Sequence, residues 1–345
     1  MVARRKVLAG LAASPLLLRG RLLQSDDAGG TASTRRHSSE PDEFTPASKR
    51  SMKMGNAWMK KTFNRDDGCG LDIGTPSDIS CSAMVGLAMM SQGTSLYEGE
   101  LYRLVRKTQH YIVTASAKNQ FTVNLNTQVK ADLSGYADHH FGALLLSQSL
   151  GQGVEDHRAR SALTSLVAKI GSGQTSKGDW GEGRYPLLGA VTGWVSLRGA
   201  WGAGLNVKAS SSATANLLYK TIKDKNRNLF PLAAGIRVIY ALGEERDGLA
   251  DWALNMAMQQ AKGLGFHHMG GEHFLALHFI NETMIQRGGD YWDKWYALVR
   301  DKLIRAQNAD GSWTGHSCIT SRTFCTACAM LVLTSPNRYL PISEI

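Results

Sequence analysis

The stretch QNADGSW, residues 307–313, is the clearest indication of how this chain folds. It continues the segment DYWDKWYALVRDKLIRAQ, in which large apolar residues recur every three or four positions and so mark one buried helix face. The stretch QTSKGDW, residues 174–180, repeats the spacing Gln-x3-Gly-x-Trp. One such turn would mark the end of a single helix, whereas two indicate a repeated unit.

Two kinds of helix-like segment alternate from Pro46 onward. The first kind is amphipathic and charged and spans residues 46–63, 97–117, 155–171, 208–224, 248–262 and 290–307. The second kind is rich in small residues and apolar nearly all round, so it must be enclosed by other helices. It comprises SAMVGLAMM, HFGALLLSQSL, GAVTGWVSLRG, LAAGIRVIYAL, HFLALHFINETM and TACAMLVL, whose central small residues lie about 49 positions apart on average.

This alternation predicts an all-α fold, an (α/α)6 toroid of six helical hairpins in which an outer ring of helices surrounds an inner ring. Small residues would let the inner backbones crowd around one axis. In the repeated turn, the amide of Gln307 would satisfy backbone groups left exposed at a helix end, and Gly311 would form the turn. Trp313 would anchor the outer helix to the next inner helix. Gln174, Gly178 and Trp180 would take the same structural roles.

The sequence also resembles a known family. Leu303-x3-Gln307-x3-Gly311-x-Trp313 and Ile170-x3-Gln174-x3-Gly178-x-Trp180 resemble the QW motif of squalene–hopene cyclases. Over roughly residues 46–342, the chain resembles the prenyltransferase/squalene oxidase repeat proteins, and NRYLPI near the end is similar to their small, exported-type bacterial members. The resemblance implies a terpenoid-cyclase-like toroid and an isoprenoid-like ligand. It says little about activity, because many functions share one fold.

The activities implied by this resemblance depend on motifs that the chain lacks or only approaches. Class II terpene cyclases use a D-x-D-D cluster whose middle acid protonates an alkene or epoxide, and no D-x-D-D occurs here. The nearest counterpart to a prenyltransferase zinc site is His316-x-Cys318, which lies too early. The GCGLD stretch at 68–72 lacks the Glu-Gln of a thioester motif. Whether the chain is an enzyme is therefore undecided; if it is one, the resemblance favours a cyclase, an isomerase or a prenyltransferase-like transferase.

Polar and aromatic residues that open the inner segments are the candidate site residues, because these helix ends would line the mouth of an axial cavity. The catalytic candidates are Asp138, His140, Glu272 and His273, and the binding candidates are Asp78, Tyr136, His139, Trp194, Phe230 and Cys325. Carboxylates at helix starts also serve as plain caps, an alternative that stays open for Asp78 and Asp138. Asp138, His140 and His273 could meet across repeats, but no local ligand spacing supports a metal site, and no cofactor is predicted.

The first 45 residues differ in composition from the rest. In residues 1–24, Arg4, Arg5 and Lys6 precede a short apolar run, as in an export signal, although an organelle transit peptide would also fit. Residues 25–45 form a polar stretch that indicates a linker, and residues 46–345 form the toroid domain. We expect an exported, cell-envelope protein if the signal is genuine, and a cytoplasmic one otherwise.

The expected partners follow from charge and composition. Residues 1–53 hold ten of the 39 Lys and Arg residues but five of the 29 Asp and Glu residues, so the remainder is only mildly basic and nucleic-acid binding is not expected. Peripheral membrane association remains an open expectation, and no protein partner is indicated. Two hypotheses remain: an enzyme or binder of an isoprenoid-like molecule with Asp138 or Glu272 as its acid, and a non-catalytic scaffold. A deep axial pocket ending in a carboxyl group would favour the first, and a filled axis the second.

Overall fold

The computed structural model describes residues 43–344, apart from residues 154, 243–247 and 266–267. The predicted leader, residues 1–24, lies outside the described residues, and so do residues 25–42 of the predicted linker. The description below concerns the unit that begins at Pro41.

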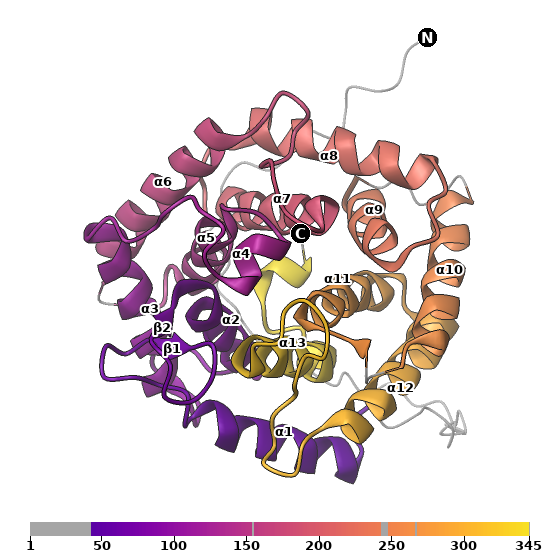
Figure 1. The fold of residues 1–345 in the computed structure, drawn as a ribbon, viewed down its shortest axis with the longest axis horizontal. Helices are drawn as coiled ribbons and strands as arrows, with labels where there is room; N and C mark the ends of the chain where they lie inside the picture. Colours follow the sequence, from indigo (N-terminus) through magenta and orange to yellow (C-terminus); the bar gives the residue numbers. More distant parts are fainter. Residues whose placement is uncertain (1–42, 154, 243–247, 266–267, 345) are drawn as a thin grey trace, which may run out of the picture. The chain divides into compact units, whose positions relative to one another are not determined.

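Twelve helices form two concentric rings, as Figure 1 shows. The outer ring consists of α1 (Pro46–Met59), α3 (Tyr102–Ala117), α6 (Asp156–Gly173), α8 (Lys208–Lys223), α10 (Leu249–Gly263) and α12 (Gly289–Ala306). The inner ring consists of α2 (Ile79–Met90), α5 (Ala137–Ser149), α7 (Pro186–Gly202), α9 (Leu229–Leu242), α11 (Gly271–Arg287) and α13 (Arg322–Thr334). The ring closes because α13 packs against α2, and α1 against both α12 and α13. The predicted all-α (α/α)6 toroid is confirmed.

The two rings differ in burial as their sequences predict. Every residue of α2 is buried, whereas α12 buries one stripe that includes Trp295 and Val299 and leaves charged residues in solvent. The small residues of the inner ring let the outer layer approach. A Cβ on Gly193 would lie 2.4 Å from the Trp180 ring, and one on Gly235 would lie 2.5 Å from Ile222 of α8. These glycines therefore allow the outer helices to pack closely on the inner helices. The sequence had predicted instead that they allow the inner helices to pack closely on one another around the axis.

The two Gln–Gly–Trp turns have the same geometry. Gln307 follows α12 with φ −68° and ψ 131°, and Gln174 follows α6 with φ −69° and ψ 132°. Gly311 and Gly178 both have φ +93°, a conformation that strains any residue with a Cβ. The carboxamide of Gln307 donates to Ser51 O of α1 at 2.9 Å, so this turn joins the sixth outer helix to the first.

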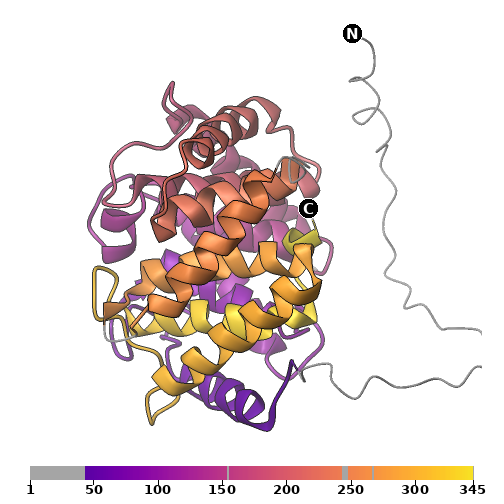
Figure 2. The same ribbon diagram turned by 90° about the vertical axis from the view of Figure 1, so that its right-hand side faces the viewer.

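Three elements were not expected from the sequence. The strands β1 (Cys69–Gly70) and β2 (Ser77–Asp78) form a small antiparallel hairpin before α2, and α4 (Gln128–Asp132) is a single helical turn before α5. In Figure 2 the C-terminus lies at the opposite end of the ring from the loop that connects α12 to α13. The η3 (Ser335–Asn337) and η4 (Pro341–Glu344) turns follow α13 toward that end. Within the residues described, no helix is both long and apolar enough to cross a bilayer.

Candidate functional site

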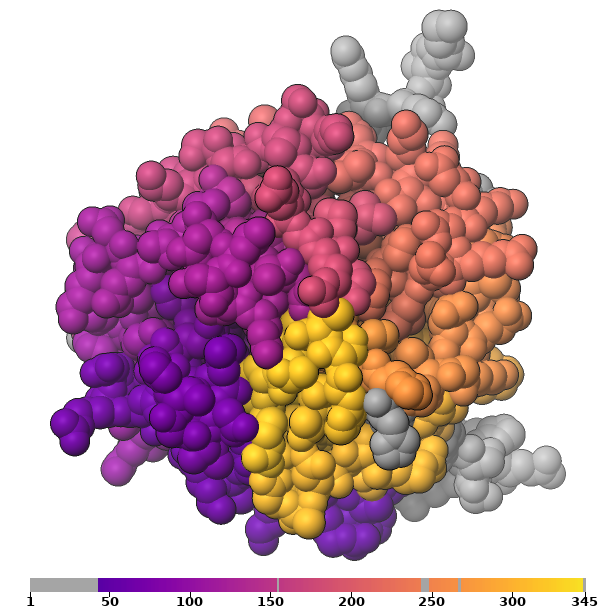
Figure 3. Space-filling view, in the orientation of Figure 1, coloured from indigo at the N-terminus to yellow at the C-terminus, as the bar shows by residue number. Residues whose placement is uncertain are grey.

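The amino ends of the inner helices meet at one end of the ring and are joined there by side-chain contacts. Asp138 of α5 reaches Ser80 of α2, and Phe230 of α9 packs on His273 of α11. The segment before α13 crosses this end, since Gln128 of α4 accepts hydrogen bonds from Thr320 N and Ser321 N. Figure 3 shows the yellow C-terminal part of the chain covering the centre of this face.

The α2–α5 groove is an open hollow of about 710 Å³ beside the amino ends of α2 and α5. Two of the predicted site residues, Asp78 and Asp138, line it. Its other lining residues are mostly polar: Arg65, Asp66, Asp67, Pro76, Ser77, Ile79, His110, Tyr111, Thr114, Lys118, Gln120, Thr122, Asn126, Thr127 and Lys130.

Asp78 is the N-cap of α2. Its backbone is extended, with φ −119° and ψ 133°, and its Oδ1 accepts a hydrogen bond from Cys81 N at 2.7 Å. Only 8% of its surface is exposed. Burial, together with the carboxylate of Asp138, raises the pKa of Asp78 to about 6 against the opposing effects of the Cys81 N–H and Lys130. The carboxyl group can therefore change protonation state near neutral pH.

Asp138 is not the cap of α5, which corrects the capping role considered from the sequence. The N-cap of α5 is Tyr136, which makes no side-chain capping bond. Asp138 Oδ1 accepts from the Ser80 hydroxyl at 2.6 Å, and its Oδ2 pairs with Lys130 Nζ at 3.0 Å. Both partners are buried, since Lys130 is 2% exposed and Asp138 is 5% exposed. Asp138 thus ties α5 to α2 and α4.

Lys130 is enclosed by oxygen atoms on the groove wall. Its ammonium group donates to Asn124 Oδ1 at 2.9 Å, Asn126 Oδ1 at 3.2 Å and Thr122 Oγ1 at 3.3 Å, besides the pair with Asp138. A buried ammonium with this many acceptors fixes the backbone of the loop before α4. The sequence reading missed Lys130 because α4 is too short to show helical periodicity.

The two histidines of α5 face protein rather than the groove. His140 is fully buried, neither of its ring nitrogens has a hydrogen-bond partner, and its ring lies edge-on to Trp180 at 4.7 Å. Burial lowers the pKa of His140 to about 3 and the pKa of His139 to about 4. His139 packs between Phe121 and Tyr136. Both therefore behave as neutral packing residues, and His140 has no access to a ligand in the groove.

Glu272 binds the segment that crosses the axis. Its Oε2 accepts from Ile319 N at 3.0 Å, and its Oε1 accepts from the Ser317 hydroxyl at 2.8 Å and contacts His273 Nδ1 at 3.2 Å. Burial raises the pKa of Glu272, but these hydrogen bonds outweigh it, and the pKa lies below its usual range. Glu272 is therefore an ionised anchor, a poor match for the protonated acid that the sequence allowed it to be.

The other predicted residues lie in separate places. Phe230 sits in a ring cluster with Tyr185 and His273, at centroid distances of 4.5 and 5.0 Å. Trp194 is a core residue of α7. Cys325 is fully buried in α13, where burial raises the pKa of its thiol. Among the residues described, no three His, Cys, Asp or Glu side chains are grouped so that they could hold a metal ion.

Sequence reasoning also missed Asp132, at the end of α4. Its side chain is buried, and burial raises the pKa of Asp132 to about 6, although Arg184 lies 3.5 Å away and opposes the shift. Its backbone carbonyl accepts from Tyr185 N at 2.7 Å, so the residue braces the start of α7. It does not line the α2–α5 groove.

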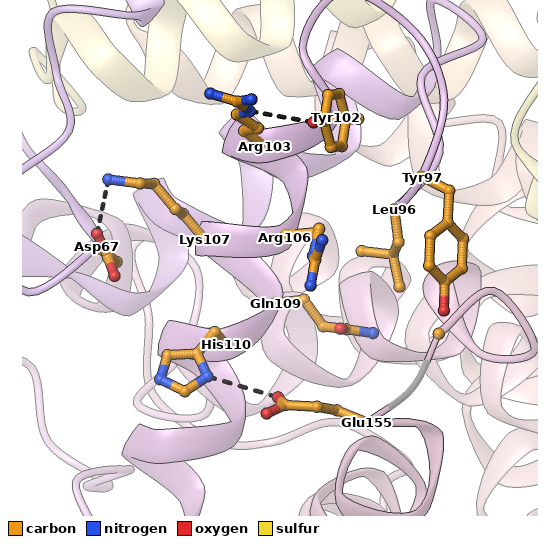
Figure 4. Close-up of a pocket in the computed structure, with 11 residues that line it drawn as sticks. Asp67, Leu96, Tyr97, Tyr102, Arg103, Arg106, Lys107, Gln109, His110 and Glu155 are labelled. Atoms are coloured by element: carbon orange, nitrogen blue, oxygen red, sulfur yellow. Dashed lines mark hydrogen bonds and ion pairs between the residues drawn. The ribbon is translucent and has the colours of Figure 1, made fainter.

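A second groove, of about 640 Å³, lies along the outer helix α3 (Figure 4). Some of its charged groups pair with one another. Lys107 pairs with Asp67 at 2.8 Å, and His110 contacts Glu155 at 3.4 Å. The site residues expected from the sequence do not line it, and we take the α2–α5 groove as the candidate site.

The axis itself is nearly filled. Side chains of the inner helices and of the C-terminal segment leave about 20 Å³ there, room for about one water molecule. The deep axial pocket that would favour a bound isoprenoid is not formed in this conformation.

Solved structures with the same fold include enzymes of two kinds. An α-1,6-mannanase from Salegentibacter sp. HEL1_6 has a TM-score of 0.59 at 8% identity, covering 84% of this chain and 99% of its own. Its inactive variant in complex with α-1,6-mannotriose has a TM-score of 0.58 at 7% identity, over 84% and 99% of the two chains. The type II terpene cyclase MstE from Scytonema, with geranylgeranyl dihydroxybenzoate bound, has a TM-score of 0.56 at 11% identity, over 85% and 98%.

No family model matches the sequence, and no curated protein is similar to it. The structural likeness confirms a terpenoid-cyclase-like α/α toroid, a fold shared by the mannanase and the cyclase. At these identities it shows the fold alone.

Proposed function

We propose that the chain binds a polar, hydroxyl-rich ligand such as an oligosaccharide in the α2–α5 groove, and that Asp78 donates a proton to it. One observation carries the proposal: the buried carboxyl group of Asp78 lies in the wall of a large polar hollow, beside the carboxylate of Asp138. Burial and this neighbour raise the pKa of Asp78 to about 6. The other predicted acids fit the role less well, since Asp138 is paired with Lys130 and Glu272 is held ionised.

The size and lining of the groove suit such a ligand. A volume of about 710 Å³ falls within the roughly 300–1,000 Å³ typical of small-molecule sites. Its amide, hydroxyl and charged side chains offer both donors and acceptors, which complement sugar hydroxyl groups. An isoprenoid-like ligand on the axis remains the alternative, and the 20 Å³ found there favours the groove.

The protonation of Asp78 matches general-acid chemistry. An acid works best when its pKa lies near the working pH, because it is then both protonated and able to give up its proton. The carboxylate of Asp138 helps to keep the pKa of Asp78 raised, and Ser80 and Lys130 hold that carboxylate in place. When two neighbouring carboxyl groups lie in different environments, their pKa values differ, so that one can act as the acid while the other stays ionised.

The test is binding and turnover with two contrasting ligands. α-1,6-Mannotriose, with matched gluco- and galacto-oligosaccharides, probes the groove, and geranylgeranyl dihydroxybenzoate probes the axis. We expect calorimetric binding of at least one sugar and release of reducing ends, with turnover lost in Asp78→Asn while binding is kept. Binding of the isoprenoid alone, or of no sugar at millimolar concentration, would contradict the proposal. Sugar binding without turnover would remove the proton-donor role.

The raised pKa of Asp78 also predicts a pH-dependent stability difference. Because the folded-state pKa lies above the unfolded value of 3.8, the favourable contribution is present at low pH and is lost as pH rises through about 6. Asp78→Asn keeps the cap and cannot ionise. Relative to wild type, it should therefore gain about 2–3 kcal/mol of unfolding free energy between pH 3.5 and pH 7.5.

Urea unfolding of both proteins at the two pH values measures this difference. Asp310→Asn is a control of opposite sign. Burial raises the pKa of Asp310, but hydrogen bonds from Ser312 and Arg322 outweigh it and lower the pKa to about 2. A pH-independent difference between wild type and Asp78→Asn would show that the pKa of Asp78 is not raised.

A further inference from the structure

The groove along α3 adjoins the candidate site. We call it the α3 groove, and its lining includes Leu96, Tyr97 and Arg106 (Figure 4). Asp67 and His110 line both this groove and the α2–α5 groove, so the two hollows meet at these residues. Each is large enough for a ligand of its own, at about 640 and 710 Å³. A ligand made of linked units can therefore reach from one groove into the other.

One face of α3 runs along both grooves. Arg103, Lys107, His110 and Thr114 follow one another at spacings of three or four residues, which places them on the same side of the helix. Arg103 and Lys107 line the α3 groove, His110 lines both grooves, and Thr114 lines the α2–α5 groove. This stripe is about 16 Å long at a rise of 1.5 Å per residue. It is therefore longer than a single sugar ring and can support several linked rings.

Arg106 is a cation in the α3 groove without a partner. Lys107 pairs with Asp67 and His110 contacts Glu155, so both carboxylates that line this groove are already engaged (Figure 4). Within the described part of the chain, Arg106 forms no hydrogen bond or ion pair, and its side chain is exposed. A guanidinium group presents its donors in a planar fork that matches a carboxylate. The groove therefore offers a position for a carboxylate that the protein itself does not fill.

The wall of the α3 groove also suits a sugar ring. Tyr97 is 49% exposed, and its neighbour Leu96 is buried. Gln109 is buried too, and its Nε2 donates to Ser149 Oγ at 3.1 Å, which fixes the amide in the wall. Sugar rings have apolar C–H faces as well as hydroxyl groups. An exposed aromatic ring and a fixed amide in one groove complement both features.

We propose that the α3 groove is a subsite for an acidic sugar residue, whose carboxylate binds Arg106 and whose ring packs on Tyr97. The inference rests on the proposed function, because neutral residues of the same oligosaccharide occupy the α2–α5 groove. Next to Asp78 and Asp138 a ligand carboxylate would be repelled, so the acidic residue belongs in the α3 groove. The ligand class is thereby narrowed from hydroxyl-rich molecules to oligosaccharides that carry a uronic acid residue.

The ligand test compares sugars that differ only in charge. Manno-, gluco- and galacto-oligosaccharides of three to six residues are titrated beside the same sugars with the terminal C6 hydroxyl oxidised to a carboxylate. Wild type should bind the oxidised form of at least one sugar about tenfold more tightly at 50 mM NaCl, because Arg106 adds a charge-assisted contact. The difference should shrink at 500 mM NaCl, since salt screens exposed charges. Equal affinity for the two forms of every sugar, or no binding of oxidised sugars, would overturn the inference.

Arg106→Gln assigns this difference to the α3 groove. Because Arg106 is exposed and unpaired, the variant should fold as wild type does. It should lose the preference for the oxidised sugar and keep its affinity for the neutral one. Arg50→Gln removes an exposed charge of α1 that lines neither groove, and it should keep the preference. A preference that survives Arg106→Gln would place the carboxylate elsewhere and contradict the inference.

Tyr97 is tested in the same way. Tyr97→Ala should weaken binding of the oxidised sugar several-fold at both salt concentrations, whereas Tyr97→Phe keeps the ring and should bind nearly as wild type does. Full affinity in Tyr97→Ala would show that the acidic residue does not lie in the α3 groove.

Asp78→Asn separates this inference from the proposed function. Asp78 does not line the α3 groove, so the variant should lose turnover and keep the preference for the oxidised sugar. Oxidised sugars that bind wild type but not Arg106→Gln, with no binding of neutral sugars, would contradict the proposed function alone. Binding of neutral sugars with turnover that depends on Asp78, but without any preference for the oxidised form, would contradict this inference alone.

Discussion

Replacing Trp313 by Ala is expected to lower the free energy of unfolding by about 3–5 kcal/mol. Trp313 is fully buried, and its indole Nε1 donates to Leu303 O of α12 at 2.8 Å. Its backbone N donates to Thr326 Oγ1 of α13 at 2.9 Å. Truncation therefore leaves a large cavity and an unpaired carbonyl where the sixth outer helix meets the sixth inner helix.

Chemical denaturation measures this change, and Gln307→Ala provides the comparison. Gln307 Nε2 donates to Ser51 O and Gly311 O, both at 2.9 Å, so its loss removes hydrogen bonds but little apolar contact. We expect a cost of about 1 kcal/mol. Trp180→Ala should resemble Trp313→Ala, because Trp180 Nε1 donates to Ile170 O in the same way. A melting temperature of Trp313→Ala within a degree or two of wild type would show that the turn is not an anchor.

Breaking the Lys130–Asp138 pair should lower the free energy of unfolding about as much as Trp313→Ala. Both side chains are buried, and removal of one leaves the other as an uncompensated charge. Lys130→Met should therefore cost about 3–5 kcal/mol, as is usual when one partner of a buried pair is lost. Lys60→Met, which breaks the exposed pair with Glu100, should cost less than about 1 kcal/mol.

Asp138→Asn should also be destabilising. As a plain helix cap, Asp138 would tolerate Asn without loss, but it is bound to Ser80 and Lys130 instead. The double variant Lys130→Met/Asp138→Asn removes both charges and should be more stable than Lys130→Met alone. Effects of the single variants that add without coupling would show that the two charges do not interact, and this ion pair would then have no role in holding α5 to α4.

The sequence by itself determined the rings of this protein. The hydrophobic periodicity of a helix indicates whether the helix is enclosed or half-exposed. The sequences of α2 and α12 alone therefore predict that α2 is apolar all round and that α12 is amphipathic. The repeated Gln–Gly–Trp spacing is local as well, because each turn closes on itself, as in the bond from Gln307 to Gly311. Elements of few residues could not be predicted in this way, since a single turn such as α4 is too short to show a period.

Only the tertiary structure decided which polar residues act together. Asp138 meets Ser80 across 58 positions of sequence, Glu272 holds Ile319 across 47, and Arg237 holds Ile342 across 105. No local pattern encodes such pairs, because they depend on how the rings close and on where connecting loops fold over the helix ends. The same packing sets how deeply each carboxyl group is buried and which hydrogen bonds it accepts. It therefore separates Asp78, with a raised pKa, from Glu272, with a lowered one, although both are carboxyl groups at the start of an inner helix.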